Sequence, residues 1–404
     1  MGFFDKHQPN ITKATPDFEY MDSKAVYLDS ACQTLRPQSV IDAMTDYFHN
    51  YNACGGRVKY EWGIKVDRMI EETRKQVLSL VGKPASDYAV AFTLNTTYGI
   101  NLILSQLPRR FERVITSEIE HNSVFLPTMT AAKRLGVPRA VLKRIPDGSL
   151  EYSLDDIKGS VVVLNTTSNI DGRILRNGKN IAEDVHSSGG ILILDAAQSL
   201  GHDRELVRGI DFDALAFSGH KLYGPSLGVM VIRKSLLEEL DVQFIGGGMV
   251  EDVLEQEYSL VTVAEDLPAR LEPGLQDFAG IAGLSAALKW LLGYKPEGMD
   301  QSVHQAQLSQ YLFGKLSALG SVRLINQSAS PILSFYSEKI DAHRLAIYLS
   351  AQNIMVRSGY FCCHYYLKNQ QNYPPLLRVS LGLHSTKKEA ETFADVLEKI
   401  INNT

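Results

Sequence analysis

Short apolar runs alternate with amphipathic segments along the first two-thirds of the chain. These runs cover residues 88–92, 113–116, 160–164, 191–194 and 214–217. Runs of this length are typical of strands that are buried on both faces of a parallel sheet. Helical patterns occur between and before them, as at 64–80 and 177–187. The alternation predicts an α/β fold built on a doubly wound, mostly parallel sheet.

A different pattern begins near residue 283, where long helices mix with short strands at 322–325 and 332–335. With 404 residues and 45% hydrophobic content, the chain is long enough to bury two cores. We expect a large domain over residues 26–282 and a smaller C-terminal α/β domain over 283–404. The N-terminal arm, residues 1–25, is expected to belong to the small domain. The acidic, irregular stretch 246–273 predicts a hairpin or loop at a subunit contact.

The charge of the chain narrows the class of partner. The net charge is −5 and no long basic run occurs, so we expect no nucleic acid and no membrane surface as the main partner. No apolar run reaches the ~18 residues of a membrane span, and the N-terminus lacks the apolar core of a secretory signal. A cytoplasmic enzyme with a small-molecule substrate is the simplest expectation. The four cysteines are expected to be thiols, because they are too few for a disulfide scaffold.

Polar residues follow two of the predicted strands directly. Asp195 ends the run 191–194, and Ser218, His220 and Lys221 follow the run 214–217. Open α/β sheets bind their ligands just outside the carboxyl ends of such strands. A lysine can form a Schiff base with an aldehyde cofactor, and an aspartate can keep a pyridine nitrogen protonated, which together suit pyridoxal 5′-phosphate (PLP) chemistry. Ser218 and His220 could bind the phosphate. Taken singly, Lys221 could be a surface residue and Asp195 a helix cap.

Taken together, the motifs at residues 195–198 and 218–225 indicate a particular enzyme family. DAAQ at 195–198 followed by SGHKLYGP at 218–225 resembles the cofactor site of the class V aminotransferase superfamily, which are fold type I PLP enzymes, and of the cysteine desulfurases in particular. The segment Asp29-Ser30-Ala31 resembles the opening of the same enzymes. The resemblance runs from about Val26 to the C-terminus.

The resemblance implies further cofactor contacts. Thr96 and Thr97, at the start of a predicted helix, match the phosphate-binding pair, although Asn-Thr-Thr is also good helix-capping chemistry. His121 is implied to lie over the cofactor ring and to exchange protons with the substrate. Asn169 and Gln198 are implied to lie near the phenolic oxygen of the cofactor. Either of these two could instead bind loop backbone.

The substrate side of the resemblance lies near the C-terminus. Cys362 matches the reactive cysteine in the pattern R-S-G-x-x-C of residues 357–362, and Arg378 matches the arginine that binds the substrate carboxylate. The neighbouring Cys363 is unusual, so one thiol of the pair is expected to face the cofactor while the other is packed or acts as a second acceptor. Both could instead be buried structural cysteines. A zinc site from Cys362, Cys363 and His364 fits known ligand spacings poorly, and no metal is expected.

The activity implied is that of a cysteine desulfurase, which converts cysteine to alanine with a persulfide on Cys362 that passes to an acceptor. The resemblance also implies a homodimer and a sulfur-acceptor protein. Three positions depart from the family pattern, namely Gly55, Cys363 and Leu275, where a threonine of relatives reaches the partner subunit's phosphate. These departures keep open a selenocysteine lyase, another carbon–sulfur lyase, an aminotransferase or an epimerase. A non-catalytic scaffold that binds the cofactor is a further alternative.

Overall fold

The chain forms two compact units. The computed structural model describes residues 16–22, 24–56, 58–261 and 270–404, so most of the N-terminal arm and part of the stretch 246–273 lie outside the described residues. Unit 1 comprises residues 1–38, 169–172 and 293–404, and unit 2 comprises residues 39–168 and 173–292.

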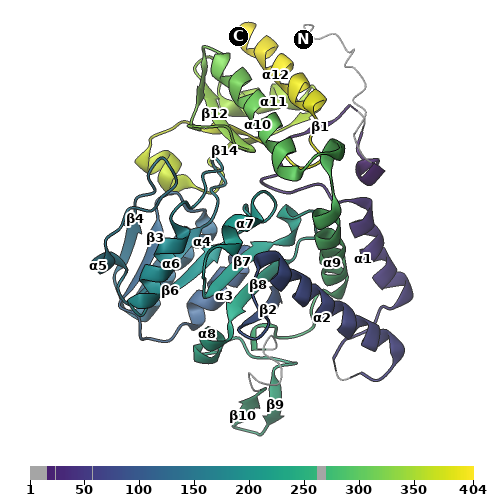
Figure 1. Cartoon of the computed structure of the whole chain (residues 1–404), viewed down its shortest axis with the longest axis vertical. Coiled ribbons are helices and arrows are strands. Elements are labelled where there is room, and N and C mark those ends of the chain that lie inside the picture. The colour runs from purple at the N-terminus through teal and green to yellow at the C-terminus, as the bar shows by residue number, and fades with distance from the viewer. Residues whose placement is uncertain (1–15, 23, 57, 262–269) are drawn as a thin grey trace. The chain divides into compact units, whose positions relative to one another are not determined.

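A seven-stranded sheet forms the centre of unit 2 (Figure 1). Its strands are β2 (Tyr88–Thr93), β3 (Arg113–Ser117), β4 (Arg139–Leu142), β5 (Ser160–Asn165), β6 (Ile191–Asp195), β7 (Ala214–Ser218) and β8 (Gly228–Arg233). Their spatial order is β2-β8-β7-β6-β5-β3-β4. Neighbouring strands from β7 to β4 run parallel, and β8 runs antiparallel to both β7 and β2. The mostly parallel sheet that the apolar runs predict is therefore confirmed.

Helices cover both faces of this sheet, which explains why its central strands are buried at every position. The helices of unit 2 are α1 (Gln38–Asn50), α2 (Glu61–Val81), α3 (Thr96–Gln106), α4 (Asn122–Leu135), α5 (Leu154–Ile157), α6 (Gly178–Ser187), α7 (Arg204–Arg208), α8 (Lys234–Glu239) and α9 (Phe278–Gly293). Apolar residues of α3, α4 and α8 join alternate positions of the strands in one buried cluster. Residues of opposite parity, such as Leu192, Leu194 and Phe217, are buried as well. Burial on both faces is the mark of a doubly wound sheet.

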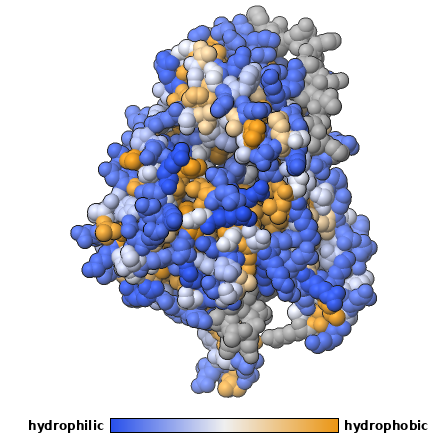
Figure 2. Space-filling view, viewed as in Figure 1, coloured by the Kyte–Doolittle hydropathy of each residue, from blue (hydrophilic) through white to orange (hydrophobic). Residues whose placement is uncertain are grey.

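A hairpin interrupts unit 2 after the sheet is complete. It is formed by β9 (Val250–Val253) and β10 (Tyr258–Leu260), which pair antiparallel within the stretch predicted to be a hairpin or loop. Val253, Leu254 and Tyr258 are each more than half exposed there. Figure 2 shows orange hydrophobic surface at the tip of this hairpin, at the lower end of the view. Exposed apolar residues at a hairpin tip are typical of a contact with another chain.

Unit 1 is built around a four-stranded antiparallel sheet of order β11-β12-β15-β14. Its strands are β11 (Val322–Leu324), β12 (Ile332–Ser337), β14 (Arg357–Gly359) and β15 (Leu376–Ser380), and β1 (Val26–Tyr27) pairs separately with β13 (Ile354–Met355). The helical elements are η1 (Pro16–Phe18), η4 (Pro296–Gly298), α10 (Gln301–Ala318), α11 (Ala342–Ser350), the π-helical segment η5 (Tyr365–Gln370) and α12 (Lys387–Asn402). Apolar residues of α10, α11 and α12 pack in one cluster with those of the strands. Unit 1 thus has a core of its own.

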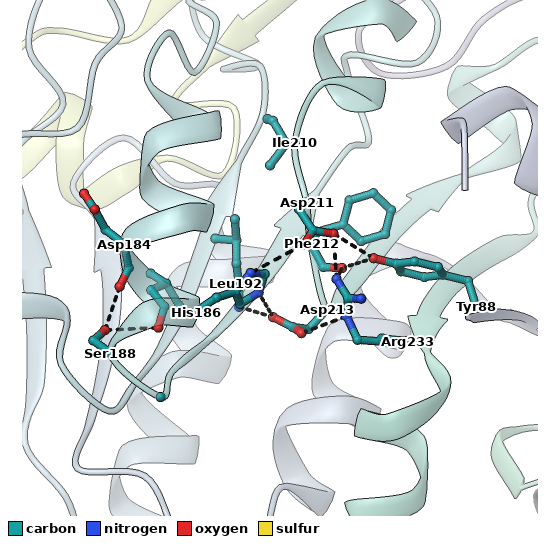
Figure 3. Close-up of polar contacts among 12 residues, drawn as sticks. Tyr88, Asp184, His186, Ser188, Leu192, Ile210, Asp211, Phe212, Asp213 and Arg233 are labelled. Atoms are coloured by element: carbon teal, nitrogen blue, oxygen red, sulfur yellow. Dashed lines mark hydrogen bonds and ion pairs between the residues drawn. The ribbon is translucent and has the colours of Figure 1, made fainter. Parts of the chain in front are cut away.

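The amino ends of β6 and β7 carry a cluster of charged residues, which we call the amino-edge cluster: Lys83, Tyr88, His186, Asp211, Asp213 and Arg233. Figure 3 shows Asp213 between His186 and Arg233. One carboxylate oxygen of Asp213 lies 2.8 Å from His186 Nε2 and accepts the Leu192 N–H at 2.8 Å, and the other accepts Arg233 Nε–H at 3.2 Å. Asp211 accepts from Arg233 at 2.6 Å and from the Tyr88 hydroxyl at 3.1 Å. These contacts tie α6, β2 and β8 to the start of β7.

Among the described residues, no helix is both long and apolar enough to cross a membrane.

Candidate active site

The predicted cofactor residues of unit 2 share one edge of the sheet. Because β2, β3, β5, β6 and β7 all point the same way, their carboxyl ends lie along a single edge, opposite the amino-edge cluster. The residues that follow or end these strands there include Thr96, Thr97, His121, Asp195, Ser218, His220 and Lys221. We call this the carboxyl edge. Ligands of open α/β folds bind at such an edge.

Ser218 links the end of β7 to the first turn of α3. Its hydroxyl accepts the Thr96 N–H at 2.9 Å and lies 2.6 Å from the Thr96 hydroxyl. The N-cap of α3 is Asn95, whose side chain accepts the Tyr98 N–H, so the two threonines are the first helical residues and not the cap. The first-turn N–H groups and the positive end of the helix dipole favour an anion at this point.

His121 is oriented by a chain of hydroxyl groups. Its Nδ1 accepts the Ser123 N–H at 3.0 Å and lies 2.8 Å from the Ser123 hydroxyl, which is itself 2.6 Å from the hydroxyl of Thr97. A ring nitrogen that accepts a backbone N–H carries no proton, so the neutral imidazole has its proton on Nε2. His121 also caps α4, which means that the position of the helix and the direction of the ring are linked. Ser123 is a site residue that sequence reasoning missed.

Asp195 is buried at the end of β6, next to the strand that leads to Lys221. One of its oxygens accepts the Ala197 N–H at 2.9 Å. Burial raises the pKa of Asp195 above that of an ordinary aspartate, and the positive charge of Lys221 partly offsets this. Lys221 ends the short 3-10 turn η2 (Gly219–Lys221) and is partly exposed. Two residues later, Tyr223 has a φ of 63°, a left-handed conformation that costs a tyrosine about 1–3 kcal/mol and is found mainly at functional sites.

Glu120 and Arg144 form a buried pair beneath this edge that sequence reasoning also missed. Glu120 accepts the Ser117 hydroxyl at 2.5 Å and the Asn165 N–H at 2.7 Å, and its carboxylate lies 4.0 Å from Arg144. Burial raises the pKa of Glu120 to about 7, against the lowering effect of the Arg144 charge. Glu120 immediately precedes His121 and binds the end of β5, so it fixes the start of the loop that carries the imidazole.

Arg378 is the centre of a polar group in unit 1. It is only 3% exposed, and it donates to the Asn169 carbonyl at 2.9 Å and to Asp29 at 3.3 Å. Asp29 also accepts from Nε and Nη2 of Arg357, at 3.1 and 2.9 Å, and Arg357 contacts the sulfur of Cys32. Burial lowers the pKa of Arg378 while the Asp29 charge raises it. A buried guanidinium of this kind suits the binding of a carboxylate.

The adjacent cysteines point to different surroundings. Cys362 is exposed, whereas Cys363 is 1% exposed and packs with Ile170 and Leu367 in a small apolar cluster. One thiol of the pair was expected to be either packed or a second sulfur acceptor. The structure shows that the thiol of Cys363 is packed. Asn169 is buried, and its amide group contacts Cys363 and Phe361. Among the described residues, no group of three or more His, Cys, Asp or Glu side chains is arranged to hold a metal ion.

The remaining predicted residues lie as follows. Gln198, three residues after Asp195, is buried, and His220 is partly exposed in η2. Leu275, which departs from the family pattern, is 74% exposed and so has little contact with its own chain.

The donors of the carboxyl edge fit PLP. The cofactor has an anionic phosphate, an aldehyde and a ring nitrogen, which need an anion site, an amine and a carboxylate. The first turn of α3, Lys221 and the buried Asp195 provide these groups on one edge of one sheet. Asn169 belongs to unit 1, and its amide already has partners in that unit.

Comparison with known proteins agrees with this chemistry. The family profile of class V aminotransferases matches residues 26–393. A probable cysteine desulfurase from Methanothermobacter thermautotrophicus is 32% identical over 93% of this chain and 94% of its own length, and one from Halalkalibacterium halodurans is 30% identical over 95% of each.

Solved structures give the same result. The apo structure of a cysteine desulfurase from Thermococcus onnurineus NA1 superposes with a TM-score of 0.85, at 28% identity, over 95% of this chain and 96% of that one. The cysteine desulfurase CsdA from Escherichia coli, described with an S-sulfonic acid, gives a TM-score of 0.83 at 25% identity over 96% and 97% of the two chains. The fold is thus that of the fold type I PLP enzymes, and the comparisons support an enzyme of the transferase or lyase type. The chain belongs to the class V aminotransferase family.

Proposed function

We propose that the protein is a PLP-dependent cysteine desulfurase that converts cysteine to alanine and passes the sulfur on through a persulfide at Cys362. The observation that carries this proposal is the pair formed by Lys221 and the buried Asp195, at the ends of adjacent strands β7 and β6. The curated relatives named as cysteine desulfurases, about 30% identical over most of the chain, support the choice of reaction.

The residues of the carboxyl edge would hold the cofactor. The N–H groups at the start of α3, with Thr96, Thr97, Ser218 and His220, would bind the phosphate. Lys221 would bind the aldehyde carbon through its amine, and Asp195 would accept a hydrogen bond from the protonated ring nitrogen. Gln198 and Asn169 would donate to the phenolic oxygen, for which Asn169 has a second side-chain N–H besides the one that binds the Phe361 carbonyl. When bound, PLP supplies an electron sink for the substrate alpha carbon.

Protons and the substrate would be handled by four side chains, namely Arg378, Lys221, His121 and Cys362. Arg378 would bind the substrate carboxylate through its planar guanidinium. Lys221 or His121 would take the alpha proton, and the Nε2 of His121 can exchange protons near neutral pH. The thiolate of Cys362 would attack the substrate sulfur as the carbon–sulfur bond breaks, which yields alanine and a Cys362 persulfide. Atoms balance without a further reactant, because cysteine and one protein thiol together equal alanine and one protein persulfide.

We also propose a homodimer and a sulfur-acceptor partner, located in the cytoplasm. Support for the dimer comes from the exposed apolar side chains Val253, Leu254, Tyr258 and Leu275, which would be covered by a second copy. A leucine cannot donate a hydrogen bond, so Leu275 would contact the second copy by packing. Support for an acceptor is the exposure of Cys362, since a persulfide must be reachable to be passed on.

The test is to incubate purified, PLP-loaded protein with cysteine, to assay alanine and persulfide at Cys362 without added thiol, and to assay sulfide in a parallel sample that contains dithiothreitol, which reduces the persulfide. Wild-type protein should produce all three, and Cys362→Ala should keep the cofactor absorbance but lose sulfide release. The control is Cys54→Ala, which removes an exposed thiol of unit 2 and should leave the rates unchanged. Turnover of another amino acid that persists in Cys362→Ala would favour an aminotransferase or epimerase, and absence of any spectral response to amino acids would favour a scaffold.

A further inference from the structure

The backbone that carries Cys362 is held in an unfavourable conformation. We call residues 360–363 the cysteine loop. Phe361 has a φ of 48° and Cys362 a φ of 58°, two successive non-glycine residues in the left-handed region. Both conformations are unfavourable for a residue with a Cβ atom, and such conformations persist only where the surrounding structure enforces them. The residues that enforce this one lie in the same unit.

Asn169 and Cys363 together hold the loop. The Asn169 side-chain N–H donates to the Phe361 carbonyl at 2.9 Å, between the two left-handed residues. The Cys363 thiol lies 3.2 Å from the Asn169 side-chain oxygen, to which it donates. The Phe361 carbonyl can only accept, so the amide nitrogen faces Phe361 and the amide oxygen faces the Cys363 thiol. The bond from the thiol then holds the amide in this direction.

Packing adds to these hydrogen bonds. Cys363 is 1% exposed within a cluster that contains Ile170, Leu367 and Leu376, and its N–H donates to the Tyr360 carbonyl at 2.8 Å. The guanidinium of Arg378 lies 4.8 Å from the centre of the Phe361 ring. The loop is therefore held by hydrogen bonds, by apolar packing and by the contact of Arg378 with Phe361, while the side chain of Cys362 is left exposed.

We propose that Cys363 is a positioning residue for the proposed reaction: its buried thiol holds the Asn169 amide in place, and this amide keeps the cysteine loop in the strained form that presents Cys362. The inference rests on the proposed function for its consequence, since the sulfur of the substrate must meet a thiol held at one place. It also assigns to Cys363 a role other than that of second sulfur acceptor, for which its burial is unsuitable.

Release of the Asn169 amide would free the cysteine loop. If the Asn169 amide turns to another partner, the Phe361 carbonyl loses its donor and the loop loses the contact that opposes its strain. The loop is then free to relax and to carry a modified Cys362 away. Weak thiol donors are suited to this task, because a sulfur hydrogen bond is released more easily than one from a hydroxyl.

Two measurements without substrate test whether Cys363 and Asn169 hold the cysteine loop in the intact, PLP-loaded protein. In Cys363→Ala, the amide hydrogen exchange of residue 363 and the rate of iodoacetamide alkylation at Cys362 should each change by about 10-fold, the effect of losing one hydrogen bond from a strained loop. Cys363→Ser, whose hydroxyl can donate to Asn169, should restore both values towards wild type. Cys54→Ala is the matched control and should leave both unchanged.

A kinetic measurement then tests the role in catalysis. In Cys363→Ala the single-turnover rate of persulfide formation should fall by about 10-fold, while KM for cysteine and the thermal midpoint of unfolding stay close to wild type. Cys363→Ser should recover the rate. Unchanged exchange, alkylation and persulfide formation in Cys363→Ala would overturn the inference, as would an equal loss in Cys363→Ser. Absence of sulfide release from the wild-type protein would refute the proposed function instead. Amide hydrogen exchange of residue 363 and alkylation of Cys362 would still show whether Cys363 holds the cysteine loop.

Discussion

The two edges of the large sheet hold similar residues in opposite electrostatic states. At the amino edge, burial acts to raise the pKa of Asp211, but the charge and hydrogen bond of Arg233 outweigh it, so the pKa is lowered. At the carboxyl edge, burial outweighs the charge of Lys221 and the pKa of Asp195 is raised. One edge thus stabilises its carboxylates with partners from the fold, and the other keeps a carboxylate that is costly to ionise. Strongly perturbed groups of the second kind are found at active sites.

The sharpest test of this contrast is Asp195→Asn. We expect activity to fall by about 10³-fold, because an amide cannot stabilise a protonated ring nitrogen as a carboxylate does. Folding stability should not fall, since a costly buried charge is removed. Sulfide release and a denaturant titration measure the two effects. A loss of stability without a loss of activity would reverse the roles assigned to the edges.

The matched change at the other edge is Asp213→Asn. The free energy of unfolding should fall by about 2 kcal/mol, because His186 and Arg233 lose the charge of their shared carboxylate. The rate per folded molecule should stay at the wild-type value. The same titration and assay are used, and a strong loss of kcat with normal stability would contradict the prediction.

A smaller effect is expected for Ser123→Ala, which removes the hydroxyl between Thr97 and His121. The Ser123 N–H still donates to the ring, so kcat should fall by only about 10-fold while stability is kept. Ser187→Ala, on the exposed end of α6, is the control.

The smallest effect is a pH dependence at the amino edge. The hydrogen bond to Asp213 raises the pKa of His186, and the negative charges of Asp213 and Asp211 raise it further. Burial and the positive charge of Arg233 lower this pKa by less, so the net effect is a raised pKa. A raised folded pKa means that the stabilisation is complete below the unfolded pKa of about 6.5 and is lost as the pH rises through the folded value. Wild type should therefore exceed His186→Gln in unfolding free energy by about 1 kcal/mol or less near pH 6, and by less at higher pH. A difference that grows with pH would contradict this.

The pattern of apolar runs was sufficient to predict the large sheet, because a strand buried on both faces leaves a short, continuous signal in the sequence. The positions of Asp195 and Lys221 were predictable for the same reason, since each stands where such a run ends. Motif resemblance added His121, Cys362 and Arg378, which no run or period marks.

Pairs of residues far apart in the sequence could not be predicted in this way. The contact between Asn169 and Cys363 joins residues 194 positions apart, and the contact of Asp29 with Arg378 spans 349 positions. Their side chains are compatible with many environments, so nothing local indicates the partner. The buried pair of Glu120 and Arg144 was missed because charged residues are usually exposed. That residues 26–38 pack with unit 1 is likewise a result of long-range pairing.

The pairing of β1 with β13 has a consequence for biosynthesis. Val26 lies beside Ile354, and Asp29 bridges to Ser380, so residues 26–29 cannot pair until the last part of the chain has been translated. The middle of the polypeptide, which contains Lys221, leaves the ribosome earlier and can acquire its own core first. In a nascent chain stalled before β15, Lys221 should therefore lie in a folded unit 2. Cys362 should not yet be part of a folded unit.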